Sequence, residues 1–380
     1  MQGPLRFRQI ELPPAAEALR AELRRFLADE RQAGHFTPDF EGWGGFSPEF
    51  SRAIGARGWI GMTWPKEYGG GGRSPLERYV LTEEMLAAGA PTRAHWVADR
   101  QSGPTILRFG TEQQKRTYLP AIARGECYFC IGMSEPDSGS DLASIRTRAT
   151  KVAGGWEIEG TKIWTSNAHR CHMMILLART SPRGEDRHAG MTQFLIELAT
   201  PGIAVRPIYN LANEHDFNEV AFDRAFVPDD RVIGETGNGW NQVTSELAFE
   251  RSGPERWLST YGLLRELVDA VGPEPGAKEA EAIGRLIAQL VTLRSMSISV
   301  AGMLAEGETP NVEAAVVKDL GTNFEQEIPA VARRLIPHAA RAPDFAHALD
   351  HAILWAPAFT IRGGTREVLR GIIARALGLR

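Results

Sequence analysis

Ser134 and Ser140 bring two hydroxyls into one short stretch, Ile131-Gly-Met-Ser-Glu-Pro-Asp-Ser-Gly-Ser-Asp141, together with a turn proline and Gly139. A loop of this kind offers backbone N–H groups and hydroxyls at close range, which suits the edge of a flavin or a pyrophosphate. Pro, Asp, Ser and Gly are also ordinary turn residues, so the stretch alone equally fits a polar surface turn.

A second stretch, Gly160-Thr-Lys-Ile-Trp-Thr-Ser-Asn167, follows further along the chain. In their order and spacing, the two stretches resemble the flavin-contacting segments of the acyl-CoA dehydrogenase family, and the resemblance spans essentially the whole chain. It implies FAD as the cofactor, an acyl-CoA thioester as the substrate and an electron-transfer flavoprotein as the acceptor. Taken singly, these residues would fit a turn serine and a core tryptophan as well.

The resemblance assigns cofactor contacts to individual residues. The backbone at Met133 and the hydroxyl of Ser134 would bond the pyrimidine side of the flavin. Trp164 would pack against the isoalloxazine, and Ser166 would bond near N5. Ser140 would lie near the FAD pyrophosphate and the acyl-CoA. The other cofactor positions that the resemblance implies are Ile131, Gly139, Thr165, Thr365 and Glu367.

The catalytic base departs from the commonest family pattern. Many members carry a Glu just before a Gly-Thr near the C-terminus, but here that position is Gly363, in Thr360-Ile-Arg-Gly-Gly-Thr365. A minority branch, including the isovaleryl and long-chain enzymes, has its base on an earlier helix, one residue before an arginine. Leu247-Ala-Phe-Glu-Arg251 matches that arrangement, so Glu250 is the expected base. Arg251 is expected beside it and, with Ser140 and Gly363, near the substrate. The alternative is a surface Glu-Arg pair.

Two family segments that reach the FAD of a neighbouring subunit are missing. Their places are taken by Val271-Gly-Pro-Glu-Pro-Gly-Ala-Lys278 and by Leu349-Asp-His-Ala-Ile-Leu-Trp-Ala-Pro357. This asymmetry resembles the subunits of heterotetrameric dehydrogenases that act on steroid side-chain CoA thioesters. It implies a second acyl-CoA dehydrogenase-like subunit in an α2β2 assembly. A diverged loop that aligns poorly is the rival explanation.

Composition excludes several classes of function. The 380 residues are enough for two or three domains, and 43% hydrophobic with 24% charged residues is typical of a globular protein. A net charge of −4 favours neither a nucleic acid nor a membrane as partner. The N-terminus lacks the apolar core of a signal peptide, so a cytoplasmic location is expected. Cys127 and Cys130 have no second pair or histidine cluster, so we expect packing and no metal site.

The elements that must position these residues change type along the chain. Up to residue 125 nearly everything reads as helix, including a capping box at Ser74-Pro-Leu-Glu77 and a second cap at Thr111. Short alternating or apolar runs then predict strands, without the long helices of a βαβ fold or a Rossmann fingerprint. From Gly237 the helical period returns and lasts to Leu377.

The predicted fold is therefore an α+β multidomain arrangement. An N-terminal helical domain (1–125), a middle β-barrel-like domain (126–232) and a C-terminal four-helix bundle (233–380) match the layout that the resemblance implies. Two other functions stay open. A flavin monooxygenase or oxidase on the same fold often lacks the C-terminal Glu, and a non-catalytic partner subunit would only support a sister chain.

Overall fold

The computed structural model describes residues 5–40 and 44–379, except the side chains of residues 246–250. The chain forms two compact units, each built from separate stretches. The helical unit comprises Met1–Phe46, Arg73–Thr92 and Leu247–Arg380, and the sheet unit comprises Ser47–Gly72 and Arg93–Glu246. The bounds of the three predicted domains stay predictions.

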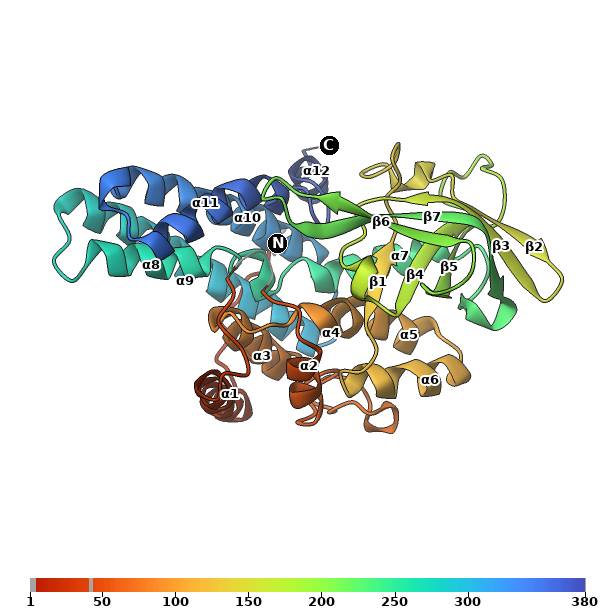
Figure 1. Ribbon diagram of the computed structural model, residues 1–380, viewed down its shortest axis with the longest axis horizontal. Helices are drawn as coiled ribbons and strands as arrows, with labels where there is room; N and C mark the ends of the chain where they lie inside the picture. Colours follow the sequence, from red (N-terminus) through yellow and green to blue (C-terminus); the bar gives the residue numbers. More distant parts are fainter. Residues whose placement is uncertain (1–4, 41–43, 380) are drawn as a thin grey trace. The chain divides into compact units, whose positions relative to one another are not determined.

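The helical unit joins N-terminal helices to C-terminal ones. Helix α1 contacts α3, α3 contacts α9, and α10 contacts α8, α9, α11 and α12. Figure 1 shows α8, α9, α10 and α11 lying side by side. The bounds are α1 Pro14–Gln32, α3 Pro75–Ala87, α8 Tyr261–Val271, α9 Ala277–Ala305, α10 Asn311–Leu335, α11 Pro343–Phe359 and α12 Arg366–Ala376.

Local sequence signals explain several helix ends. At α3, Ser74 Oγ accepts from Glu77 N (3.2 Å) and Glu77 Oε2 accepts from Ser74 N (2.9 Å), so the predicted capping box is present. Gly89 follows the helix with a left-handed φ of 63°, as expected for a C-terminal glycine. Helix α2 (Pro48–Gly55) ends at Gly55, and a turn follows it.

Helix α9 is long and apolar enough to cross a membrane by length and composition alone. Half of its most apolar window is buried inside the protein. Because core helices of soluble proteins pass the same test, its packing against α3 and α10 accounts for the pattern.

Short helices precede the strands in the sequence of the sheet unit. They are α2 Pro48–Gly55, α4 Arg93–Val97, α5 Gly103–Phe109 and α6 Glu112–Ala123, with a π-helical turn at Ala98–Ser102. Helix α7 (Gly239–Glu250) runs from this unit into the helical one. At α6, Thr111 and Gln114 form the second capping box, as the sequence predicts for the Thr111 cap.

The strands form one eight-stranded mixed sheet in the order β6-β7-β3-β2-β4-β5-β8, with β1 paired to β4. Most pairs are antiparallel, but β1 and β2 each run parallel to β4. β4 is buried along its whole length, and a core that includes Phe194, Trp156 and Phe222 covers the sheet. The bounds are β1 Phe129–Gly132, β2 Arg148–Val152, β3 Gly155–Lys162, β4 Met173–Arg179, β5 Met191–Glu197, β6 Ile203–Tyr209, β7 His215–Pro228 and β8 Val232–Ile233.

Candidate active site

The two stretches singled out by the sequence meet in the sheet unit. The first begins at the end of β1 and the second at the end of β3, and Ile163 N donates to Ser134 O (2.9 Å) where they lie together. Ile131, Met133 and Ser134 are half-buried, as is Ser166 in the second stretch. The fold thus brings the predicted flavin-contacting segments side by side.

A buried ion pair fixes this junction. Lys162, at the end of β3, is 0% exposed, and its ammonium donates to Glu135 Oε1 (2.8 Å) and Met133 O (2.9 Å). Glu135 also accepts the backbone N–H groups of Arg146 (2.6 Å) and Thr147 (2.9 Å). The carboxylate of Glu135 therefore links the first stretch to the segment before β2 and to the end of β3.

Burial and pairing shift the pKa values of both residues. Burial lowers the pKa of Lys162 to about 8, although the charge of Glu135 opposes that shift. Burial alone would raise the pKa of Glu135, but Lys162 and the two backbone donors hold it below its ordinary value. The sequence analysis missed both residues. A signal was present, since Lys162 ends a stretch that alternates like a strand, and a lysine that becomes buried there must find a partner.

Trp164 is held in an unusual conformation. Its φ is 59°, a left-handed value that is uncommon for residues other than glycine. The indole is 56% exposed and meets the ring of Phe217 edge-on, with centroids 5.8 Å apart. The next residue, Thr165, is buried, and its hydroxyl has no hydrogen-bond partner among the described residues.

The tip of the first stretch is open. Gly139 and Ser140 are exposed, and a Cβ added at Gly139 would meet no atom within 4 Å. Asp141 bonds the hydroxyl of Ser144 and the guanidinium of Arg187, and the pKa of its carboxyl lies below the ordinary value, mainly because of the Ser144 bond.

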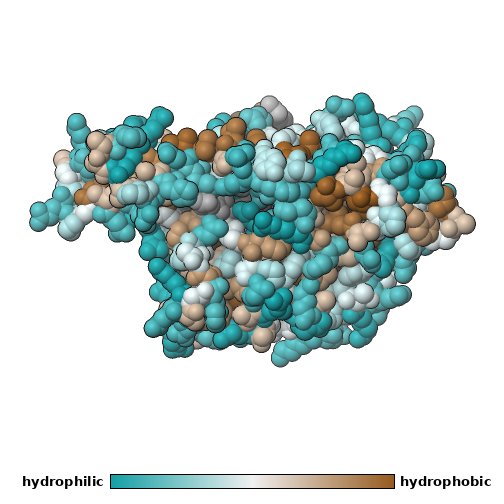
Figure 2. All heavy atoms as spheres, viewed as in Figure 1, coloured by the Kyte–Doolittle hydropathy of each residue, from teal (hydrophilic) through white to brown (hydrophobic). Residues whose placement is uncertain are grey.

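These features fit FAD. An exposed indole offers a stacking surface, the buried Thr165 hydroxyl lacks a partner in the part of the chain that the structure describes, and the loop tip has room for a ligand. Figure 2 shows that apolar side chains also gather over the sheet strands on the face drawn. The predicted cofactor roles of Ile131, Met133, Ser134, Gly139, Ser140, Trp164, Thr165 and Ser166 stay predictions.

The remaining predicted residues belong to the helical unit. Gly363 and Gly364 have consecutive left-handed φ values of 64° and 95° before α12. Buried Arg251 donates to Gly363 O (3.3 Å), and Lys318, which is 0% exposed, donates to Gly364 O (2.7 Å). The sequence analysis missed Lys318. Two buried cations, Arg251 and Lys318, thus hold the turn that contains Gly363 and Gly364.

Helix α12 begins just after this turn. Thr365 is its N-cap and accepts from Val368 N (3.4 Å), while Glu367 is exposed in the first turn. The backbone of Glu250 ends α7, but its side chain lies outside the described part of the structure. Its role as the base, and that of Arg251 beside it, therefore stay predictions.

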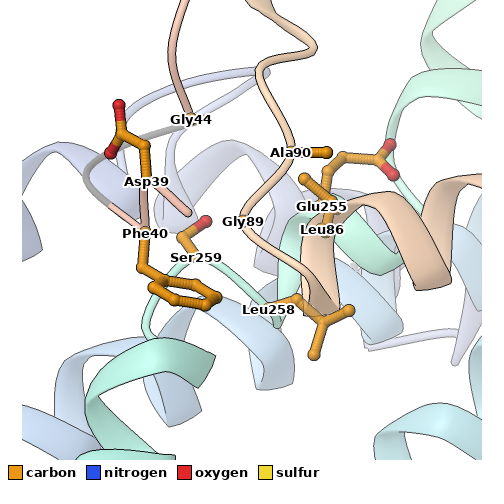
Figure 3. A pocket seen from close by; sticks show the side chains of 9 residues that line it. All are labelled: Asp39, Phe40, Gly44, Leu86, Gly89, Ala90, Glu255, Leu258 and Ser259. Carbon is orange, nitrogen blue, oxygen red and sulfur yellow. The ribbon is translucent and has the colours of Figure 1, made fainter. Parts of the chain in front are cut away.

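A separate pocket lies in the helical unit (Figure 3). The segments around Asp39 and Gly89 form two of its walls, and Glu255, Leu258 and Ser259 face them. None of the predicted site residues lines it.

The described residues contain no group of three His, Cys, Asp or Glu side chains that could hold a metal ion. Cys130 is buried on β1, and burial raises the pKa of its thiol; burial also raises the pKa of Cys127 to about 12. Both thiols therefore stay protonated at neutral pH.

Comparison with known proteins gives a match over most of the chain. The family models for the acyl-CoA dehydrogenase N-terminal, middle and C-terminal domains match residues 13–126, 130–225 and 237–378. Acyl-CoA dehydrogenase IpdE1 of Mycobacterium tuberculosis is 37% identical over 388 residues, 96% of this chain and 97% of that protein. Acyl-CoA dehydrogenase FadE34 of the same organism is 35% identical over 87% of this chain. The match covers only 46% of the length of FadE34.

Solved structures agree. A steroid ACAD named Tcur3481-Tcur3483 superposes with a TM-score of 0.85 at 30% identity, covering 97% of this chain and 99% of that one. The ChsE4-ChsE5 complex of Mycobacterium tuberculosis gives 0.83 at 29% identity, over 98% of this chain and 100% of the other. The predicted order of helical, β and helical regions is thereby confirmed.

Proposed function

Because the chain belongs to the acyl-CoA dehydrogenase family, whose members bind FAD, we propose that it dehydrogenates acyl-CoA thioesters with a bulky or branched acyl group. Its enzyme type is that of an acyl-CoA dehydrogenase, an oxidoreductase, and its cofactor is FAD. The observation that carries the proposal is the junction in the sheet unit, where the segments of Ser134 and Trp164 are joined beside an exposed indole.

The chemistry divides between the cofactor and the chain. FAD supplies the acceptor for the hydride that leaves the β carbon. The chain must remove the weakly acidic α proton, which needs a carboxylate shielded from water and donors near the thioester oxygen. We assign the base to Glu250, since Gly363 offers no proton-accepting group. Arg251 follows it in the chain and bonds Gly363 O, which ties the proposed base to that turn.

Two features support a bulky acyl group. Gly363 has no side chain where many family members carry a Glu, so the substrate would gain room there. A similar solved structure is named a steroid ACAD, and that name describes the similar protein. We therefore favour steroid-like or branched acyl groups over straight chains.

We also propose a second acyl-CoA dehydrogenase-like subunit. The stretches 271–278 and 349–357, where family members reach a neighbour's FAD, form the α8–α9 connection and part of α11 in this chain. Two similar structures bear paired names, Tcur3481-Tcur3483 and ChsE4-ChsE5. An α2β2 assembly, reoxidation by an electron-transfer flavoprotein and a cytoplasmic location complete the proposal.

Glu250→Gln tests the base. This change keeps the shape of the side chain and removes its basicity, so turnover of the flavin-loaded assembly should fall at least ~10²-fold with FAD content unchanged. Gly363→Glu in that background should restore only part of the activity, because a left-handed φ of 64° strains any side chain. Near-normal turnover of Glu250→Gln would place the base elsewhere. Oxygen consumption without an added acceptor would instead indicate an oxidase.

The assembly is tested by expressing the chain with and without the partner subunit encoded nearby. Light scattering and flavin quantitation should show poor FAD occupancy for the chain alone and two flavins per α2β2 assembly. A homotetramer with one FAD per subunit would contradict the proposed partner.

A further inference from the structure

Asn218 bonds both backbone polar groups of Thr165, the residue after Trp164. It lies on β7 and is 0% exposed. Its backbone oxygen accepts from Thr165 N (3.1 Å), and its Nδ2 donates to Thr165 O (2.9 Å). Both polar backbone groups of Thr165 are therefore held by one asparagine, which fixes where the segment leaves β3.

Two stacked histidines hold the carboxamide from the other side. Nε2 of His215 lies 2.8 Å and Nδ1 of His169 lies 3.2 Å from Oδ1 of Asn218. The two rings stack with centroids 3.7 Å apart and planes 19° from parallel. Since Thr165 O can only accept, Nδ2 must face it and Oδ1 must face the rings, so both histidines donate an N–H to one oxygen.

Burial and nearby charges favour the neutral form of His169. Burial, then His215, Arg170 and Arg93, lower the pKa of His169 to about 4, although its bond to Asn218 opposes the shift. Arg93 is itself paired to Asp216 Oδ1 (2.7 Å), and the ring of Tyr209 lies 5.7 Å from that of His215.

The same strand holds the segment at a second point, because Asn167 N donates to Asp216 O (2.9 Å). Trp164, just before the first anchor, and Asn167, the second anchor itself, both adopt left-handed φ values, of 59° and 56°. Such conformations persist in residues other than glycine only where the surroundings impose them. Next to Trp164, the side chain that holds the backbone is that of Asn218, through its bond to Thr165 O.

We propose that Asn218 is a positioning residue that orients the Trp164 segment for flavin binding, with His169 and His215 fixing its carboxamide. The inference rests on the proposed function, since it assumes that Trp164 packs against FAD. In this role Asn218 acts through the Trp164 segment and needs no contact with FAD itself.

The test measures FAD affinity, by titrating the deflavinated assembly with FAD and following flavin fluorescence, together with the flavin absorption bands. Asn218→Leu keeps the volume and removes every side-chain hydrogen bond, so FAD should bind at least ~10-fold more weakly and its bands should shift. Glu219→Gln is the matched control. It changes the next residue of β7, whose exposed ion pair with Arg206 (2.8 Å) should leave affinity within about twofold.

Asn218→Asp keeps the test decisive if the leucine variant fails to fold. A carboxylate at this position repels Thr165 O, whereas the protonated acid can donate to it as the amide does. The ratio of variant to wild-type affinity should therefore rise as the pH falls from 8 to 5.5. Unchanged affinity and bands in Asn218→Leu, or a pH-independent ratio in Asn218→Asp, would overturn the inference. A wild-type assembly that binds no FAD would overturn the proposed function instead.

Discussion

Lys162→Met tests the buried pair that joins the two flavin-contacting segments. Methionine is similarly long and unbranched, so the change removes the ammonium while keeping most of the packing. Glu135 would lose the cation 2.8 Å away and keep its two backbone donors, and Met133 O would lose its 2.9 Å donor. Breaking a buried pair on one side costs about 3–5 kcal/mol.

For a unit of roughly 150–250 residues, 1 kcal/mol corresponds to about 2–4 °C in Tm, so the transition of the sheet unit should fall by about 6–20 °C. The assay is thermal unfolding followed by circular dichroism, with flavin release recorded in parallel. Arg148→Met is the control. It breaks an exposed pair with Glu159 (2.7 Å), for which we expect less than about 1 kcal/mol.

A double-mutant cycle separates the pair from the packing. Glu135→Gln in the Lys162→Met background removes the uncompensated charge, so the double variant should be more stable than Lys162→Met alone. A Tm of Lys162→Met within about 2 °C of wild type, or strictly additive effects, would refute the reasoning that this ion pair holds the junction.

Two further predictions concern strain and acid. Gly364→Ala should lower both Tm and turnover, because its φ is 95° and the new Cβ would lie 3.2 Å from Nη2 of Arg251. Gly378→Ala shares a left-handed φ of 70° but meets no atom within 4 Å, so it should lower Tm alone; equal turnover losses would contradict a role for the Arg251 contact. Burial lowers the pKa of His95, beside Ser51 Oγ (2.9 Å), to about 4, so the unfolded state binds the proton first. Its stabilising contribution is present above pH 6.5 and is lost as the pH falls toward 4, by up to about 3 kcal/mol. In a series of Tm measurements against pH, His95→Gln should reduce the loss of Tm between pH 6.5 and 4. An unchanged loss would show that other groups cause it.

Local signals made much of the fold predictable. Ser74 and Glu77 lie within one turn of each other, so their capping box is readable from sequence, and the strands around Met173 and Phe194 show as apolar runs. Helix α11 falls within the region predicted to be helical from Gly237 to Leu377, but its own bounds were not predicted, because its stretch was interpreted only for a missing family segment.

The site was predictable as segments but not as an arrangement. Ser134 and Trp164 carry recognisable motifs, whereas the pairing of Lys162 with Glu135 and of Asn218 with Thr165 depends on which strands become neighbours. The left-handed φ of Trp164 also has no local cause in the sequence, since neither glycine nor asparagine stands there. Such contacts follow from tertiary packing, which propensity and periodicity do not encode.

The way the units share the chain sets an order for folding on the ribosome. The sheet unit is complete once Glu246 has been made, but α1 and α3 belong to a unit that also needs residues 247–380. At about 5–20 residues per second, those helices wait on the order of ten seconds for α9 and α10. During that interval α3, which packs against α9 in the finished protein, lacks this C-terminal partner. Nascent chains long enough for Glu246 to have left the ribosome, but still without α10, should therefore protect the sheet from protease while α1 and α3 remain cleavable and available to a chaperone.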